Sequence, residues 1–231
     1  HPGAVRGRER PGQIKRAVKQ LLGAKKPVIY AGGGVVIAEA SKQLTQLAKL
    51  LNFPVTNTLM GLGTYPGSDR QIVGMLGMHG TFEANTAMHY ADVILAVGAR
   101  FDDRVTNTPS KFCPDATIIH IDIDPTSISK TINADIPIVG SCDSVLQEMI
   151  DQIEESGKRP DDTAIAAWWH QIDDWRARHG LYTAPRHGES SGSLIKPQDV
   201  IKMLYKVTNG QAYVCSDVGQ HQMFAAQYYL F

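Results

Sequence analysis

The chain has 231 residues, of which 43% are hydrophobic and 20% are charged, a globular composition that excludes a disordered or fibrous protein. Its 23 basic and 23 acidic residues cancel, so charge favours neither nucleic acid nor an anionic membrane as a partner. Three cysteines without C-x-x-C spacing argue against a disulfide framework or a zinc site, and no apolar run approaches the roughly 20 residues of a membrane helix, so we expect a cytoplasmic protein.

Helical and strand-like segments alternate through the first two thirds of the chain. Apolar residues at helical spacing predict helices over residues 12–26, 37–52, 81–91 and 143–155. Short apolar runs predict strands over residues 27–31, 53–59, 92–99, 117–124 and 136–140. Thr81 is expected to cap the third helix and Asp143 or Ser144 the fourth, while residues 60–80 are interpreted as a glycine-rich loop. This alternation indicates an α/β fold with a parallel sheet covered by helices on both faces.

The character of the chain changes near residue 157. A helix over residues 164–179 carries Trp168, Trp169 and Trp175, which we interpret as a docking face rather than a cofactor site. A Gly-, Ser- and Pro-rich connector follows, then a helix opened by Pro197 and a strand over residues 212–219. Because one strand cannot make a sheet, we expect a truncated second α/β domain. The predicted units are residues 12–156 (central domain), 157–195 (linker) and 196–231 (start of the second domain).

Several glycine-rich segments follow predicted strands, where dinucleotide-binding folds hold their ligand. Gly32 to Gly34 stand in that position, but without G-x-G-x-x-G spacing a tight turn explains them better. Residues 74–81 combine glycine with Met75, Met78 and His79, which suits a flat aromatic ligand as well as a plain surface loop.

Charged residues follow two further strands. Arg100 and Arg104, interleaved with Asp102 and Asp103, could hold a phosphate or a carboxylate, or could form an ion-paired loop. Asp122 is the candidate for a ribose hydroxyl, with helix capping by a neighbouring carboxylate as the alternative. Three further histidines are expected to be packed or half-buried: His89, His120 and His170. No catalytic residue and no metal ligand is expected within the chain.

Five segments together resemble one family: "LMGLGTYPG", "LGMHGTFEAN", "VGARFDDRVT", "HIDIDPTSISK" and "SDVGQHQMFAA". In this order they are similar to the catalytic large subunit of the acetolactate synthases, thiamine-diphosphate enzymes, and the resemblance covers nearly the whole chain from Gly12 onward. The family has a pyrimidine-binding domain, a Rossmann-like (DHS-like) central domain that binds FAD, and a pyrophosphate-binding domain. The resemblance implies that this chain holds the central domain and the first elements of the third.

The resemblance also implies an activity and partners. Family members use thiamine diphosphate and Mg²⁺ to decarboxylate pyruvate and condense it with a second 2-oxo acid, in branched-chain amino-acid synthesis. Their FAD has no net redox role. They form homodimers or tetramers, some with a regulatory small subunit. The glutamate that activates thiamine and the Gly-Asp-Gly…Asn metal motif are expected outside this chain, so the fragment alone is expected to be inactive.

Carried over residue by residue, the resemblance implies three sets of contacts. FAD would be contacted by Gly32, Gly33, Gly34, Thr58, Leu59, Leu76, Gly77, Met78, His79, Gly98, Arg100, Asp102, Val105, Asp122 and Ile123. Arg104 would stand at the mouth of the substrate channel, and Gly219, Gln220 and His221 would meet thiamine diphosphate. The family commonly has Asp where this chain has Ser141, which puts that FAD contact in doubt. The alternatives are glyoxylate carboligase, pyruvate oxidase, a nicotinamide dehydrogenase and a non-catalytic nucleotide-binding module.

Overall fold

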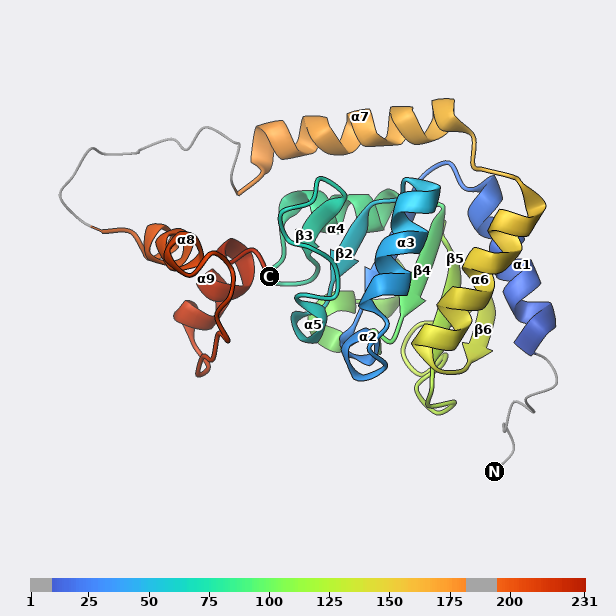
Figure 1. The fold of residues 1–231 in the computed structure, drawn as a ribbon, viewed down its shortest axis with the longest axis horizontal. Coiled ribbons are helices and arrows are strands. Elements are labelled where there is room, and N and C mark those ends of the chain that lie inside the picture. The colour runs from blue at the N-terminus through green and yellow to red at the C-terminus, as the bar shows by residue number, and fades with distance from the viewer. Residues whose placement is uncertain (1–9, 182–194) are drawn as a thin grey trace.

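A computed structural model of the chain describes residues 10–181 and 195–231 (Figure 1). Its centre is a six-stranded sheet in the order β3-β2-β1-β4-β5-β6, and every neighbouring pair is parallel. The strands are β1 (Pro27–Ala31), β2 (Val55–Asn57), β3 (Ile72–Met75), β4 (Val93–Val97), β5 (Thr117–Asp122) and β6 (Ile136–Val139). The predicted parallel α/β fold is therefore confirmed. Within the described residues, no helix is both long and apolar enough to span a membrane.

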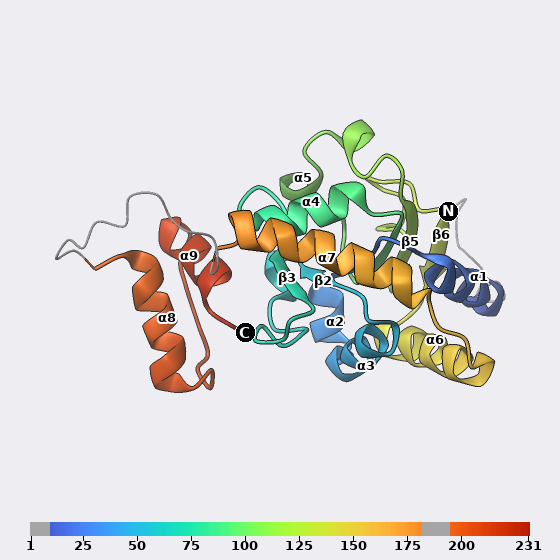
Figure 2. The same cartoon turned by 90° about the horizontal axis from the view of Figure 1, so that it is seen from above.

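Helices cover both faces of this sheet, as predicted. Figure 2 shows α3 (Ser41–Leu51) and α6 (Cys142–Ser156) on one face and α4 (Phe82–Tyr90) on the other. α1 (Arg10–Gly23) packs beside β6 and α6. All five residues of β1 and of β4 are buried, as expected for central strands covered on both sides.

The start of the second predicted helix and the cap of α6 differ from the prediction. The helix expected over residues 37–52 begins at Ser41 as α3, and Ile37 ends a separate short helix, α2 (Gly33–Ile37); Glu39, between the two, adopts a left-handed φ of 51°. Ile37 is consequently 87% exposed instead of lying on the buried stripe. Thr81 caps α4 as predicted, accepting a hydrogen bond from the Ala84 N–H at 3.1 Å. The N-cap of α6 is Ser141, so the prediction of a cap at residue 143 or 144 is wrong.

Strand β3 was not predicted, since residues 60–80 were interpreted as a loop. It is four residues long, lies at the edge of the sheet and pairs with β2 alone, through an irregular register. Gly74 within it adopts a φ of +94°, which residues with a side chain rarely adopt, and the pairing with β2 is irregular. A short edge strand of this kind leaves little periodic signal in the sequence.

Helix α7 (Asp162–His179) lies across the edge at which the strands begin (Figure 1). The indole N–H groups of Trp168 and Trp169 donate to the carbonyls of Pro27, at the start of β1, and Asn52, just before β2, at 3.0 and 2.8 Å. Arg176 donates to the Ile72 carbonyl, at the start of β3, at 2.9 Å. The tryptophan cluster is thus a docking face, as predicted, and it lies at the edge of the sheet opposite the carboxyl ends of the strands.

The C-terminal segment forms α8 (Pro197–Thr208) and α9 (Gln220–Tyr228), which pack on each other. Gln227 on α9 donates to the His79 carbonyl at 2.7 Å, and the Gly67 N–H donates to the Phe231 carbonyl at 2.7 Å. Residues 212–219 form no strand, so that prediction is wrong: no neighbouring strand is present to pair with their backbone. Residues 182–194, which make up most of the Gly-, Ser- and Pro-rich connector, lie outside the described residues. The division into residues 12–156, 157–195 and 196–231 stays a prediction.

Candidate cofactor site

The carboxyl ends of β1 and β4 meet at the centre of the sheet, where the strand order reverses. Open parallel sheets bind ligands in the crevice at such a switch point. The backbones of the two following loops are joined there: the Gly32 N–H donates to the Val97 carbonyl at 2.9 Å, and the Gly34 N–H to the Gly98 carbonyl at 3.0 Å. The predicted glycine segments 32–34 and 98 therefore come together in one place.

These glycines are needed because the two loops touch. A Cβ on Gly32 would lie 2.2 Å from the Gly98 carbonyl oxygen, and one on Gly34 would lie 2.6 Å from the Gly98 Cα. Gly98 itself has a φ of +58°, which side chains other than glycine rarely adopt. None of Gly32 to Gly34 adopts a positive φ, so the interpretation of this segment as a tight turn that needs one is wrong; the close approach of the two backbones requires glycine instead. Gly33, between them, is half-buried and faces Met60.

The loop after β3 is hydrogen-bonded to the loop after β4. Leu76 and Gly77 are buried, whereas Met78 and His79 are exposed. The Met78 N–H donates to the Arg104 carbonyl at 2.9 Å, so the methionine–histidine segment and the arginine segment lie side by side.

Asp102 orders the loop after β4. Its side chain caps the short helix α5 (Asp103–Thr106), accepting a hydrogen bond from the Arg104 N–H at 3.1 Å. Interaction with the Asp103 side chain and the hydrogen bond from the Arg104 backbone, together with the charges of Arg100 and Arg104, hold the pKa of Asp102 below its ordinary value. Val105 is half-buried behind it.

The two arginines of this loop remain available for a ligand. Arg100 and Arg104 are exposed, and across the described parts of the chain neither forms an ion pair with a carboxylate. The structure therefore does not bear out the interpretation of this segment as an ion-paired loop. Two unpaired guanidinium groups beside a crevice can accept a phosphate or a carboxylate.

The end of β5 carries two carboxylates with different tasks. Asp124 accepts hydrogen bonds from the backbone N–H and the hydroxyl of Thr126, both at 2.8 Å, and so holds the turn after β5. No helix lies in the described residues between β5 and β6 for it to cap, so the alternative of helix capping is wrong. Asp122 is only 8% exposed, and its Oδ1 accepts from the Asp124 N–H at 2.9 Å. Ile123 between them is exposed. Asp122 is thus held at the strand end where a ribose hydroxyl would be bound.

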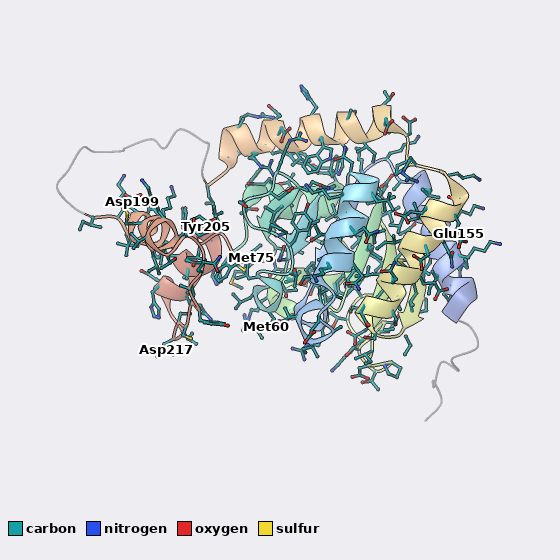
Figure 3. The ribbon with its side chains drawn as sticks, in the orientation of Figure 1. Met60, Met75, Glu155, Asp199, Tyr205 and Asp217 are labelled. Atoms are coloured by element: carbon teal, nitrogen blue, oxygen red, sulfur yellow. The ribbon has the colours of Figure 1, made fainter. Side chains whose placement is uncertain are left out.

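Apolar side chains are exposed around this edge, which is the property expected of a site for a flat aromatic ring. They are Leu59 and Met60 after β2, Met78 after β3 and Ile123 after β5. Thr58, at the end of β2, has a buried Oγ1 without a hydrogen-bond partner in the described residues. An orphaned hydroxyl and an apolar rim over bare glycine backbone fit a dinucleotide that carries an aromatic ring system. Figure 3 shows Met60 at the edge of the sheet opposite α7.

The candidate diphosphate residues are not brought into this crevice. Gly219 is the N-cap of α9, and Gln220 and His221 are exposed on its first turn. The other end of that helix contacts the central unit, through Gln227 and His79. Asp217, just before Gly219, lies in the lobe of α8 and α9, away from Met60 (Figure 3). Within residues 10–181 and 195–231, no group of three His, Cys, Asp or Glu side chains is arranged to hold a metal ion.

Sequence reasoning missed two residues of the site and misplaced two histidines. Asn85 on α4 holds the loop after β3 through three hydrogen bonds, and Met60 contributes to the apolar rim. Asn85 stands inside "LGMHGTFEAN", so its segment was noticed but its contact was not. His120 is fully buried, with Nε2 2.8 Å from the Ala99 oxygen, as predicted. His89 and His170 are exposed, so that part of the prediction is wrong.

Comparison with known proteins places this geometry in a family. Residues 14–149 match the family model for the thiamine pyrophosphate enzyme, central domain. The chain is 58% identical over 221 residues to the acetolactate synthase isozyme 3 large subunit of Escherichia coli, covering 95% of this chain and 38% of that protein. It is 54% identical over 220 residues to the acetolactate synthase large subunit of Haemophilus influenzae, covering 95% and 37%. It is 44% identical over 216 residues to the acetolactate synthase of Mycobacterium avium, covering 94% and 34%.

The matches cover almost all of this chain. The chain spans less than two fifths of the length of each of these relatives. The matched family region contains all six strands and the loops at their carboxyl ends. From its parallel sheet and these matches, the chain belongs to the thiamine pyrophosphate enzymes and contains their central domain.

Proposed function

We propose that this chain is part of the catalytic large subunit of an acetolactate synthase. The observation that carries the proposal is the 58% identity over 221 residues to a large subunit of that name. The reaction is the condensation of pyruvate, with loss of CO₂, with a second 2-oxo acid, either pyruvate or 2-oxobutyrate, in the synthesis of branched-chain amino acids. When bound, thiamine diphosphate supplies the electron sink for the decarboxylation.

The carboxyl edge of the sheet is the proposed FAD site. Three features support it: the closely packed glycine backbone at positions 32–34 and 98, the exposed apolar rim, and the buried hydroxyl of Thr58 without a partner in the described chain. Asp122 would accept a hydrogen bond from the ribose, and Met78 and His79 would lie against the flavin. Arg100 would face the phosphates.

Arg104 is proposed as the residue that binds the substrate carboxylate. It is exposed, carries no ion pair in the described chain, and its backbone is fixed to the methionine–histidine segment. Gly219, Gln220 and His221 are proposed to meet the diphosphate of thiamine diphosphate, where N–H groups at a helix start suit an anion. We propose that Mg²⁺ accompanies that diphosphate, with ligands outside residues 1–231.

The proposed assembly follows the relatives' names. Two of them are called large subunits, which supports a regulatory small subunit as a partner. We further propose a cytoplasmic homodimer or tetramer.

A product assay of the full-length protein tests the activity. With pyruvate, thiamine diphosphate, Mg²⁺ and FAD, we expect acetolactate as the product. Tartronate semialdehyde from glyoxylate, or peroxide from pyruvate and oxygen, would assign the chain to a different thiamine enzyme. Flavin is tested separately on the 231-residue chain, by the quenching of FAD fluorescence and the absorption spectrum of the bound ligand. A nicotinamide spectrum, or no binding of FAD, would contradict the cofactor.

A further inference from the structure

Asn85, on the second turn of α4, binds the backbone of the loop after β3 from behind. Its Oδ1 accepts from the Gly77 N–H at 3.0 Å, and its Nδ2 donates to the carbonyls of Gly77 at 3.0 Å and Thr81 at 3.1 Å. Because Gly77 offers both a donor and an acceptor to one amide, this pairing also fixes which way the amide points. A single side chain thus satisfies both polar backbone groups of a buried residue.

The opposite side of Gly77 touches the arginine loop. Gly77 has a φ of +108°, and a Cβ there would lie 2.8 Å from the Arg104 carbonyl oxygen and 3.2 Å from a methyl carbon of Val105. The next residue, Met78, donates to that same Arg104 carbonyl at 2.9 Å. Gly77 is therefore held between Asn85 on one side and the backbone of the substrate-arginine loop on the other.

We propose that Asn85 is a positioning residue for the two proposed ligands at this edge of the sheet, FAD and the substrate carboxylate. By fixing Gly77 it sets the spacing between the flavin-facing pair, Met78 and His79, and the loop that carries Arg104. Asn85 is half-buried behind the loop and acts on the ligands only through it. This role rests on the proposed FAD site.

Substitution by Ala or Asp separates the hydrogen bonds from the packing. Asn85→Ala leaves the N–H of buried Gly77 without a partner and its carbonyl with the Gly80 N–H alone, at 2.9 Å, which favours opening of the loop. Asn85→Asp keeps the side-chain volume and the acceptor for the Gly77 N–H. It replaces the donor with a second carboxylate oxygen that faces two carbonyls, so the pairing still fails. Thr86→Ala is the matched control, because Thr86 is the next residue on α4 and is also half-buried.

The experiment uses the 231-residue chain and two readouts. The first is amide hydrogen exchange at Gly77 and Met78, and the second is the dissociation constant for FAD. We expect at least tenfold faster exchange at both amides in Asn85→Ala, and at Met78 in Asn85→Asp. Affinity for FAD is expected to fall about tenfold in both variants, while Thr86→Ala changes neither readout. Thermal melts show whether each variant is folded. If Asn85→Ala does not fold, the test uses Asn85→Asp, whose side chain has nearly the native volume.

Unchanged exchange at Gly77 and Met78 in a folded Asn85 variant would overturn the proposal. Faster exchange with unchanged affinity for FAD would also overturn it, because release of the loop would then have no effect on FAD binding. If the unsubstituted chain bound no FAD at all, the cofactor assignment would fail, whereas the exchange data would still decide whether Asn85 holds the two loops together.

Discussion

Gly98 shows how one residue determines the shape of the crevice. Its φ of +58° and its contact with Gly34, whose Cα would lie 2.6 Å from an added Cβ, leave no room for a side chain. We expect Gly98→Ala to lower the free energy of unfolding by about 3 kcal/mol or more, since left-handed strain of roughly 1–2 kcal/mol is joined by a backbone clash. Urea denaturation measures the loss, and FAD binding is expected to disappear.

Gly157 provides the control for that substitution. It has a similar φ of +64° but an added Cβ would meet nothing within 4 Å. Gly157→Ala should therefore cost only the strain, about 1 kcal/mol, and leave the affinity for FAD unchanged. Equal losses in the two variants would show that backbone strain, and not contact between the two loops, makes Gly98 necessary.

Glu83, in the first turn of α4, is a buried acid whose effect depends on pH. It is 6% exposed, its Oε2 has no hydrogen-bond partner in the described chain, and burial raises its pKa, although the charges of Arg176 and His179 oppose the shift. The folded protein therefore holds this proton more tightly than the unfolded chain. The free energy of unfolding falls as pH rises through the interval between the two pKa values.

Glu83→Gln removes that titration. Relative to the unsubstituted chain, we expect it to gain on the order of 1 kcal/mol at pH 8, where the buried carboxylate is charged, and less at pH 4, where it is protonated. Thermal melts at both pH values measure the difference. Glu155→Gln, on the exposed side of α6 (Figure 3), should show no pH-dependent difference. A gain from Glu83→Gln that is the same at both pH values would be inconsistent with this account.

At the scale of elements, α7 holds together the edge of the sheet opposite the site. Trp168 is 1% exposed and donates to the Pro27 carbonyl at the start of β1. Trp168→Ala should lower the free energy of unfolding by about 3–5 kcal/mol, because it removes a large buried side chain and leaves a cavity. Trp168→Phe, which keeps most of the volume but loses the hydrogen bond, should cost about 1 kcal/mol.

His170 lies on the same helix and is exposed, so His170→Ala should change stability by no more than about 0.5 kcal/mol. Urea denaturation compares the three variants. If Trp168→Ala cost no more than His170→Ala, α7 would not be docked as the structure has it.

The elements that sequence could predict are those whose signal is local and periodic. The buried runs of β1, β4 and β5 and the capped start of α4 at Thr81 are of that kind. The break at Glu39 was invisible because it depends on one backbone angle. β3 was invisible because it is an edge strand of only four residues and contains Gly74, which marks a turn or loop in the sequence. The expected strand at residues 212–219 failed because a strand is a property of a pair and not of one segment.

At the scale of the whole molecule, some residues of the proposed site could be predicted from the sequence and others could not. Its glycines, arginines and Asp122 were predictable because all parallel strands present their carboxyl ends at one edge. Asn85 and the orphaned hydroxyl of Thr58 were not, because their roles arise from contacts that only the folded chain creates. The sequence therefore pointed to the edge of the sheet where we propose the site, but not to the contacts that hold its loops together.

Binding of FAD should stabilise the central unit and leave the C-terminal lobe unchanged. The proposed contacts come from the ends of β1 to β5, whereas α8 packs on α9 and exposes Val200, Met203 and Val207. At a free concentration 100 times its dissociation constant, FAD should raise the free energy of unfolding of the central unit by about 2.7 kcal/mol. Amide exchange should slow at residues 32–34, 76–79, 98–105 and 122–123, and stay unchanged at 197–208.

Adenosine diphosphate provides the partial ligand that tests the orientation of FAD. It has the ribose and phosphates but no flavin, so it should slow exchange at residues 122–123 and 32–34 and leave residues 76–79 as they are in the free chain. FAD alone should protect both ends of the crevice, because its flavin reaches the segment of Met78 and His79. Protection of residues 76–79 by adenosine diphosphate would reverse the proposed orientation. Protection by FAD confined to the lobe of α8 and α9 would remove the site from the sheet altogether.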